Sequence, residues 1–340
     1  MSDAPSLAAV ATGQLSVTDK ALIWGSWLLA GYLFLTVGWS GMRPDDPQGA
    51  VSLLGRSGAI LMVLQAGALA AVTAALGTVL AGRRLVEVGS FASAVGLALV
   101  SLRGATIEPL LLYHANASGG SHRGLAVLAA IEAVCWFVVM VIVLIVSGFV
   151  MQWCFGGDRR GGVGPTFRSV RFEDPRIHAA FDLGGVLPLR GARAGSERTP
   201  LADGIRHTVL TVLGGVAAFN IVSTGWSSRA IEHGQVCFVI AASFCAAGYV
   251  AHRFAPVRSA LWSVLAVGVV AVGGYVWAAV RPGLPVGPAS IPGSNFLRIL
   301  PIQFISVGTA ACIAMFWYLH LPEEEAGGVA DGPAGYADGG

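Results

Sequence analysis

The stretch that decides the fold is LAVLAAIEAVCWFVVMVIVLIVSGFVM, residues 125–151, in which Glu132 is the only charged side chain. A membrane-spanning helix needs about 20 consecutive, predominantly apolar residues, because its backbone must satisfy its own hydrogen bonds inside hydrocarbon. This run exceeds that length. It therefore predicts a transmembrane helix that carries one acid within the membrane.

Seven further windows have the same apolar character, although some of them are short: 21–40, 57–80, 86–102, 205–223, 235–251, 261–280 and 300–321. Arg83 and Arg84 interrupt the nearly continuous apolar stretch 57–102. Two arginines in the middle of a membrane are costly, so we place a turn there. The chain is thus predicted to be an all-α, polytopic transmembrane bundle of about eight helices.

The composition of the whole chain agrees with this prediction. Of its 340 residues 55% are apolar and 12% are charged, against about 25% charged residues in soluble domains. This apolar composition excludes a soluble enzyme and a nucleic-acid-binding protein, and the net charge of +2 is too small to indicate a polyanionic partner. The expected partners are the lipid bilayer and either other membrane subunits or further copies of the chain.

The basic residues set the expected orientation. If the polar segment 152–204 is cytoplasmic, 14 of the 21 Lys and Arg residues lie on the cytoplasmic side, which places both termini there. The chain has one lysine, Lys20, against 20 arginines. This bias, with the abundance of Ala and Gly, is typical of GC-rich bacteria, so we expect a multi-pass protein of the bacterial inner membrane.

Five regions follow from these spans. They are a cytoplasmic N-terminal segment (1–20), a first four-helix half (21–151), a cytoplasmic arginine-rich loop (152–204), a second four-helix half (205–321) and a disordered acidic, glycine-rich tail (322–340).

The two halves share landmarks in the same order. Gly-Trp-Ser occurs at 38–40 and 225–227, Ala-x-Arg occurs at 81–83 and 251–253, and an arginine, Arg103 or Arg281, ends the third span. Four spans per copy is an even number, so a 4+4 duplication would give parallel halves about an axis along the membrane normal. The alternative is chance, since Trp and Arg are common at span ends.

Polar residues within the spans are the first candidates for function, because burying them in lipid is expensive. Glu132 and Gln65 lie about 10 Å from the outer side at the helical rise, and Asn220 and Gln303 are also in the outer parts of their spans. Together they predict a polar pocket that opens outward. We expect Glu132 to face the bundle interior, neutral and hydrogen-bonded to another helix, with Gln65 as a candidate partner. The alternative is that these residues only hold helices together.

A second candidate site lies in the outer loop after the third span, where Arg103, Glu108 and His114 surround a proline. These residues suggest a gate or a docking surface. The alternative is a local ion pair, which contributes little in water.

Histidines stand near span ends on both sides of the membrane, as a pair of transmembrane haems would require. The inner set is His207, His252 and His320, and the outer set is His114, His122 and His233. Ordinary interfacial histidines are the alternative. The sequence contains no HExxH, no GxSxG and no nucleotide-binding P-loop, so no enzyme, cofactor or metal site is predicted.

Three functions remain open. The leading hypothesis is a non-enzymatic subunit or scaffold of a membrane assembly. The second is a transporter for a small solute or a proton, with Glu132 as its coupling acid. The third is a haem-carrying redox subunit.

Overall fold

The computed structural model describes residues 17–46, 49–54, 56, 58–81, 87–111, 123–155, 201–226, 231–257, 259–281 and 294–320. The named secondary-structure elements of these ranges are all helices, and they form the polytopic helical bundle that the hydropathy pattern predicts. The structure thereby confirms the fold class.

The elements with their bounds are α1 (Val17–Leu33), the π-helical turn η2 (Phe34–Gly38), α2 (Trp39–Met42), α3 (Ala59–Ala81), α4 (Val88–Arg103), α6 (Arg123–Phe155), α8 (Leu201–Val222), η3 (Ser223–Trp226), α9 (His233–Phe254), α10 (Leu261–Val280), η4 (Asn295–Arg298) and α11 (Pro301–His320). The first three are continuous and act as one span. Within the described ranges, seven helical segments are long and apolar enough to cross a membrane.

The eighth expected span, α4, is shorter than the others, with 16 residues. Most of its side chains are buried, and it packs against α1, α3, α6 and α11. Because other helices surround it, α4 does not have to match the thickness of the lipid itself. The prediction of about eight helices is therefore met by seven long helices and one short, buried one.

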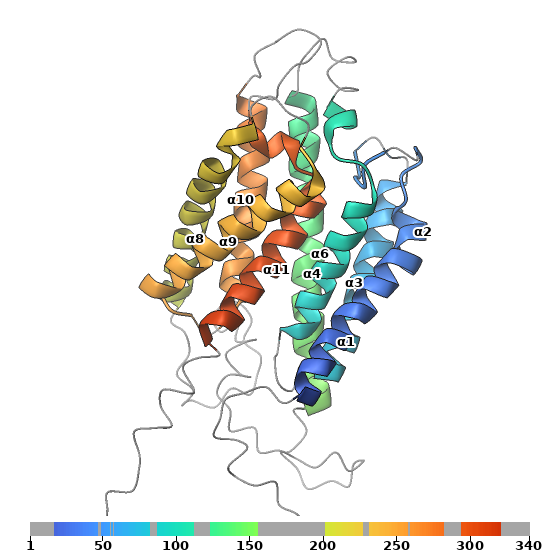
Figure 1. The fold of residues 1–340 in the computed structure, drawn as a ribbon, viewed down its shortest axis with the longest axis vertical. Helices are drawn as coiled ribbons and strands as arrows, with labels where there is room; N and C mark the ends of the chain where they lie inside the picture. The colour runs from blue at the N-terminus through green and yellow to red at the C-terminus, as the bar shows by residue number, and fades with distance from the viewer. Residues whose placement is uncertain are drawn as a thin grey trace, which may run out of the picture.

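The helices stand roughly side by side along the long axis of the bundle, with α8 and α1 at opposite edges of the view (Figure 1). We call the end at which α3, α6, α9 and α11 begin the upper end, which is the top of Figure 1. It is the end expected to face outward. α1 and α8 both begin at the lower end, so the two halves run in the same sense.

The halves repeat the same neighbour relations. In the first half α1 packs on α3 and α4, and α6 packs on both of these; in the second half α8 packs on α9 and α10, and α11 packs on both of these. Between the halves, α6 contacts α10 and α11, and α11 contacts α4. The fourth helix of each half thus contacts the third helix of the other half.

One packing contact distinguishes the halves. α3 and α4 approach closely, whereas α9 and α10 share no comparable contact. The approach depends on Gly77 and Gly89, because a Cβ atom added to Gly89 would lie 2.2 Å from the carbonyl oxygen of Ala74. Small residues allow two backbones to meet in this way within a membrane.

Candidate functional site

Glu132 lies in the third turn of α6 and is 1% exposed. Its carboxyl group accepts three hydrogen bonds. The Ser52 hydroxyl donates to Oε2 at 2.6 Å and the Trp136 indole N–H donates to Oε1 at 2.9 Å, while the backbone N–H of Leu53 provides the third. Glu132 therefore faces the interior as expected, but two of its donors come from a non-helical segment and not from another helix.

The direction of these bonds is fixed by the chemistry of the partners. An indole N–H and a backbone N–H can only donate. The Ser52 oxygen already accepts from the N–H of Leu54 at 3.2 Å, and its hydrogen points to Glu132. Both carboxyl oxygens of Glu132 are consequently used as acceptors.

Residues 49–54, which we call the inserted segment, enter the upper end of the bundle between α2 and α3. Ala50, Val51 and Leu54 are buried, and the carbonyl of Gly49 accepts from Ala105 N at 3.0 Å. Gly104 lets the segment come close, because a Cβ there would lie 2.9 Å from the backbone nitrogen of Val51. Apolar burial holds the segment in place, and Glu132 accepts from its Ser52 hydroxyl and its Leu53 N–H.

Gln303, in the first turn of α11, is also buried, at 2% exposed. Its amide nitrogen lies 2.7 Å from Nδ1 of His233, and Nε2 of His233 lies 2.9 Å from the carbonyl oxygen of Gly104. Since a carbonyl only accepts, Nε2 carries the hydrogen, and Nδ1 then accepts from Gln303. This chain links α11 and α9 to the end of α4, and so joins the two halves.

Gln65 and Asn220 do not join Glu132. Both side chains are exposed on the surface of the bundle. Gln65 packs on Gly41, and Asn220 donates to the carbonyl of Val216 in its own helix at 2.7 Å. The expected pocket of four polar residues is therefore wrong, because similar depth in the membrane did not place these two on the inner faces of their helices.

The structure separates the residues of the proposed outer-loop site. The Arg103 guanidinium stacks over the Trp39 ring at 4.4 Å and donates to the carbonyl of Leu35 at 2.6 Å. Glu108 turns the other way and accepts from Ile231 N of the second half at 3.0 Å. The expected Arg103–Glu108 pair is thus replaced by two separate contacts. His114 lies outside the described residues.

Arg298 is a further polar residue at the upper end, and the sequence analysis did not identify it. It is buried in η4, and its guanidinium donates to the carbonyl of Trp226, in the second Gly-Trp-Ser step. The pKa of Arg298 is lowered, because the effect of burial exceeds the opposing effect of the negative charge of Glu108. Its position directly before an apolar span could have identified it in the sequence. A cation that is buried at such a position needs a hydrogen-bond acceptor.

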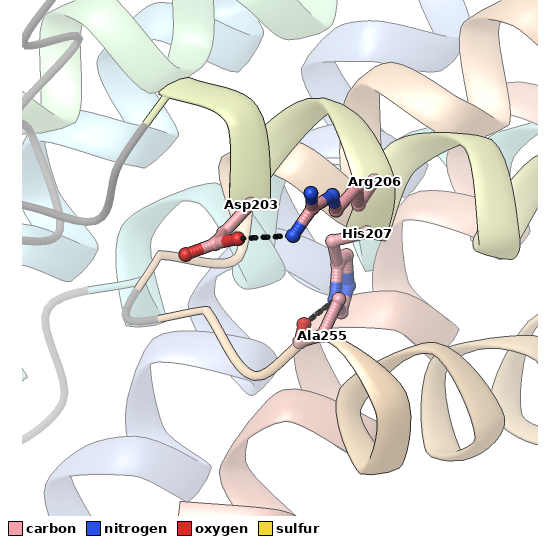
Figure 2. Close-up of polar contacts among 4 residues, drawn as sticks. All are labelled: Asp203, Arg206, His207 and Ala255. Carbon is pink, nitrogen blue, oxygen red and sulfur yellow. Dashed lines mark hydrogen bonds and ion pairs between the residues drawn. The ribbon is translucent and has the colours of Figure 1, made fainter.

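At the lower end His207 of α8 is buried and uses both ring nitrogens, one of them in the bond to Ala255 that Figure 2 shows. Nδ1 lies 2.8 Å from the carbonyl of Ala255, so it donates, and Nε2 lies 2.8 Å from the Ser263 hydroxyl. Figure 2 also shows Arg206 on the same helix, turned to an exposed ion pair with Asp203 at 3.3 Å. His207 and His233 therefore both bind protein groups through each of their nitrogens, which leaves neither poised as an axial ligand.

Groups of three or more His, Cys, Asp or Glu side chains suited to a metal ion are absent from the described ranges. Comparisons with protein-family models, with curated proteins and with solved structures find no match to this chain.

Proposed function

We propose that this protein is a non-enzymatic scaffold or subunit of a membrane assembly, built as two four-helix halves that are fastened at their upper ends. The observation that carries the proposal is the use made of Glu132 and Gln303. Each side chain is almost fully buried, and its hydrogen bonds hold a neighbouring segment of the chain in place. Polar groups used in this way give a bundle one defined arrangement.

The contacts between the halves support the same proposal. His233 and Ile231 of the second half bind Gly104 and Glu108 of the first. Hydrogen bonds of this kind restrict rocking of one half against the other, whereas a transporter that alternates between two open states needs such motion.

The test is the mass of the protein as it leaves its own membrane. Patches of native membrane are excised directly into polymer-bounded nanodiscs, and native mass spectrometry is used to weigh the complexes. We expect a stoichiometric assembly, either with another membrane protein or with further copies of this chain. A population of single chains with lipid alone, at the natural expression level, would overturn the proposal.

A second candidate is proton-coupled transport, and one observation favours it. Two of the donors to Glu132 belong to the inserted segment, which is not a helix, so a movement of this segment would release the acid to the upper surface. Proton flux into liposomes containing the purified protein tests this role. Flux that disappears in Glu132→Gln and persists in the surface variant Asn220→Leu would support it.

The membrane location and orientation are part of the proposal. The proposal rests on the basic residues of the sequence, 14 of which fall on the cytoplasmic side if both termini are placed there, as expected of an inner-membrane protein. Reporter fusions after Arg84, Gly195 and His252 should all report cytoplasm. A periplasmic signal at Gly195 would contradict the orientation.

A further inference from the structure

A groove on the membrane-facing side of the bundle runs between α6 and α10 near the upper end. Its volume is about 370 Å³, within the roughly 300–1,000 Å³ typical of ligand pockets. Its walls are valines and other apolar side chains at helical spacing, among them Val127 and Val134 of α6 and Val272 and Val276 of α10. The groove is therefore suited to a flexible hydrocarbon chain.

Positive charge stands at one end of this apolar groove. Arg123, the first residue of α6, is exposed and lines the groove. Arg281 follows the last residue of α10, and its guanidinium stacks over the Trp277 ring at 4.7 Å. α6 and α10 run in opposite directions, so the start of one and the end of the other place both arginines at the upper end. An arginine presents several donors to a phosphate.

We propose that this groove binds one anionic phospholipid, with the phosphate held by Arg123 and Arg281 and an acyl chain lying between the valines. The dimensions agree with this occupant. From Val272 to Val280 the groove follows α10 for about 12 Å at the helical rise, which is close to the thickness of one leaflet of a hydrocarbon core about 30 Å thick.

The charge distribution favours a lipid over a second copy of the chain. An anionic lipid combines a negative head with an apolar tail, and the groove combines a cationic end with an apolar length. A second copy would present its own arginines to these arginines at a two-fold interface, and like charges across an interface are unfavourable.

The experiment is a lipid titration of the full-length protein, measured by native mass spectrometry in detergent. The probes are phosphatidylglycerol and phosphatidylcholine with identical acyl chains. We expect tighter binding of one phosphatidylglycerol. Each of Arg123→Gln and Arg281→Gln should weaken it about 5-fold, and the double variant about 25-fold, since a basic residue near an anionic surface contributes about that factor.

Two further variants separate the parts of the site. Val276→Trp fills the groove from its exposed, lipid-facing side and should remove the tight site while both arginines remain. Arg43→Gln is the matched control, because Arg43 is exposed at the upper end and outside the groove; it should leave binding unchanged. Equal affinity for the two lipids would overturn the proposal, and so would binding that is unchanged by the double variant or by Val276→Trp. A change of oligomeric mass in Val276→Trp would also overturn it, because it would identify the groove as a protein interface.

Discussion

The two halves follow one plan of helix contacts but fasten their upper ends with different chemistry. The first half uses the carboxyl of Glu132 to receive three donors, whereas the second uses the amide of Gln303 to donate to His233. Both residues lie on the fourth helix of their half and both follow an isoleucine, Ile131 or Ile302. The two side chains have opposite hydrogen-bonding roles, because the Glu132 carboxyl accepts and the Gln303 amide donates.

The difference follows from what each residue has to satisfy. The first half buries the inserted segment, which is not helical, and its Leu53 N–H needs an acceptor inside the bundle. In the second half α9 begins immediately after residue 232, where Glu232 and Gln235 form a reciprocal capping box, so the first N–H groups of that helix are already satisfied. A buried loop requires a strong acceptor, and a capped helix does not.

The largest effect is expected from removing the acceptor altogether. Glu132→Leu leaves Ser52, Leu53 and Trp136 with unsatisfied donors, and should reduce the free energy of unfolding by about 3–5 kcal/mol. The measurement is unfolding in mixed micelles of increasing denaturing detergent. Gln303→Leu is the matched variant in the second half and should cost about 1–2 kcal/mol, because it breaks one neutral bond. Equal losses would show that the two residues play equivalent roles.

The next effect concerns the close contact that only the first half contains. Gly89→Ala places a Cβ against the backbone of α3, so α3 and α4 must separate, at a cost of about 2–3 kcal/mol. Gly273→Ala is the control in α10, where an added Cβ meets nothing within 4 Å. It should be neutral or slightly stabilising, because alanine favours a helix more than glycine does. The same unfolding assay would contradict this interpretation if both alanines behaved alike.

Glu132→Gln sharpens the comparison by giving both fourth helices an amide. The size of the side chain is preserved, but the amide nitrogen must face either Trp136 or the inserted segment, each of which presents an N–H donor. We expect a loss of about 1–3 kcal/mol and faster hydrogen exchange at residues 50–54. Unchanged stability and exchange would mean that the inserted segment adapts to an amide, and that the two halves are chemically interchangeable.

The smallest effect is expected at Asn220, which the sequence grouped with Glu132. Its side chain is exposed and bonded to its own helix, so Asn220→Leu should change the free energy of unfolding by less than about 0.5 kcal/mol. The same variant should leave the exchange of residues 50–54 unaltered. A large loss of stability would show that Asn220 belongs with the buried polar residues and would contradict its exposed position.

The sequence placed polar residues along their spans, but it did not determine the direction of a side chain around the helix axis. Gln65 and Glu132 were assigned similar depths, yet one faces outward and the other inward. Uniformly apolar helices such as α3 and α6 give little indication of their inner face, because lipid and protein interior are both apolar.

The sequence by itself determined the long apolar helices and the acid within residues 125–151, and it contained an indication of one partner that the sequence analysis did not use. Trp136 lies four residues after Glu132, and residues at that spacing share a helix face. Ser52 lies 80 positions away in sequence, and Arg298 meets Trp226 only after the second half has folded. These partners were decided by the tertiary structure, because a buried polar group bonds whatever packing brings within reach, and packing depends on all the helices at once.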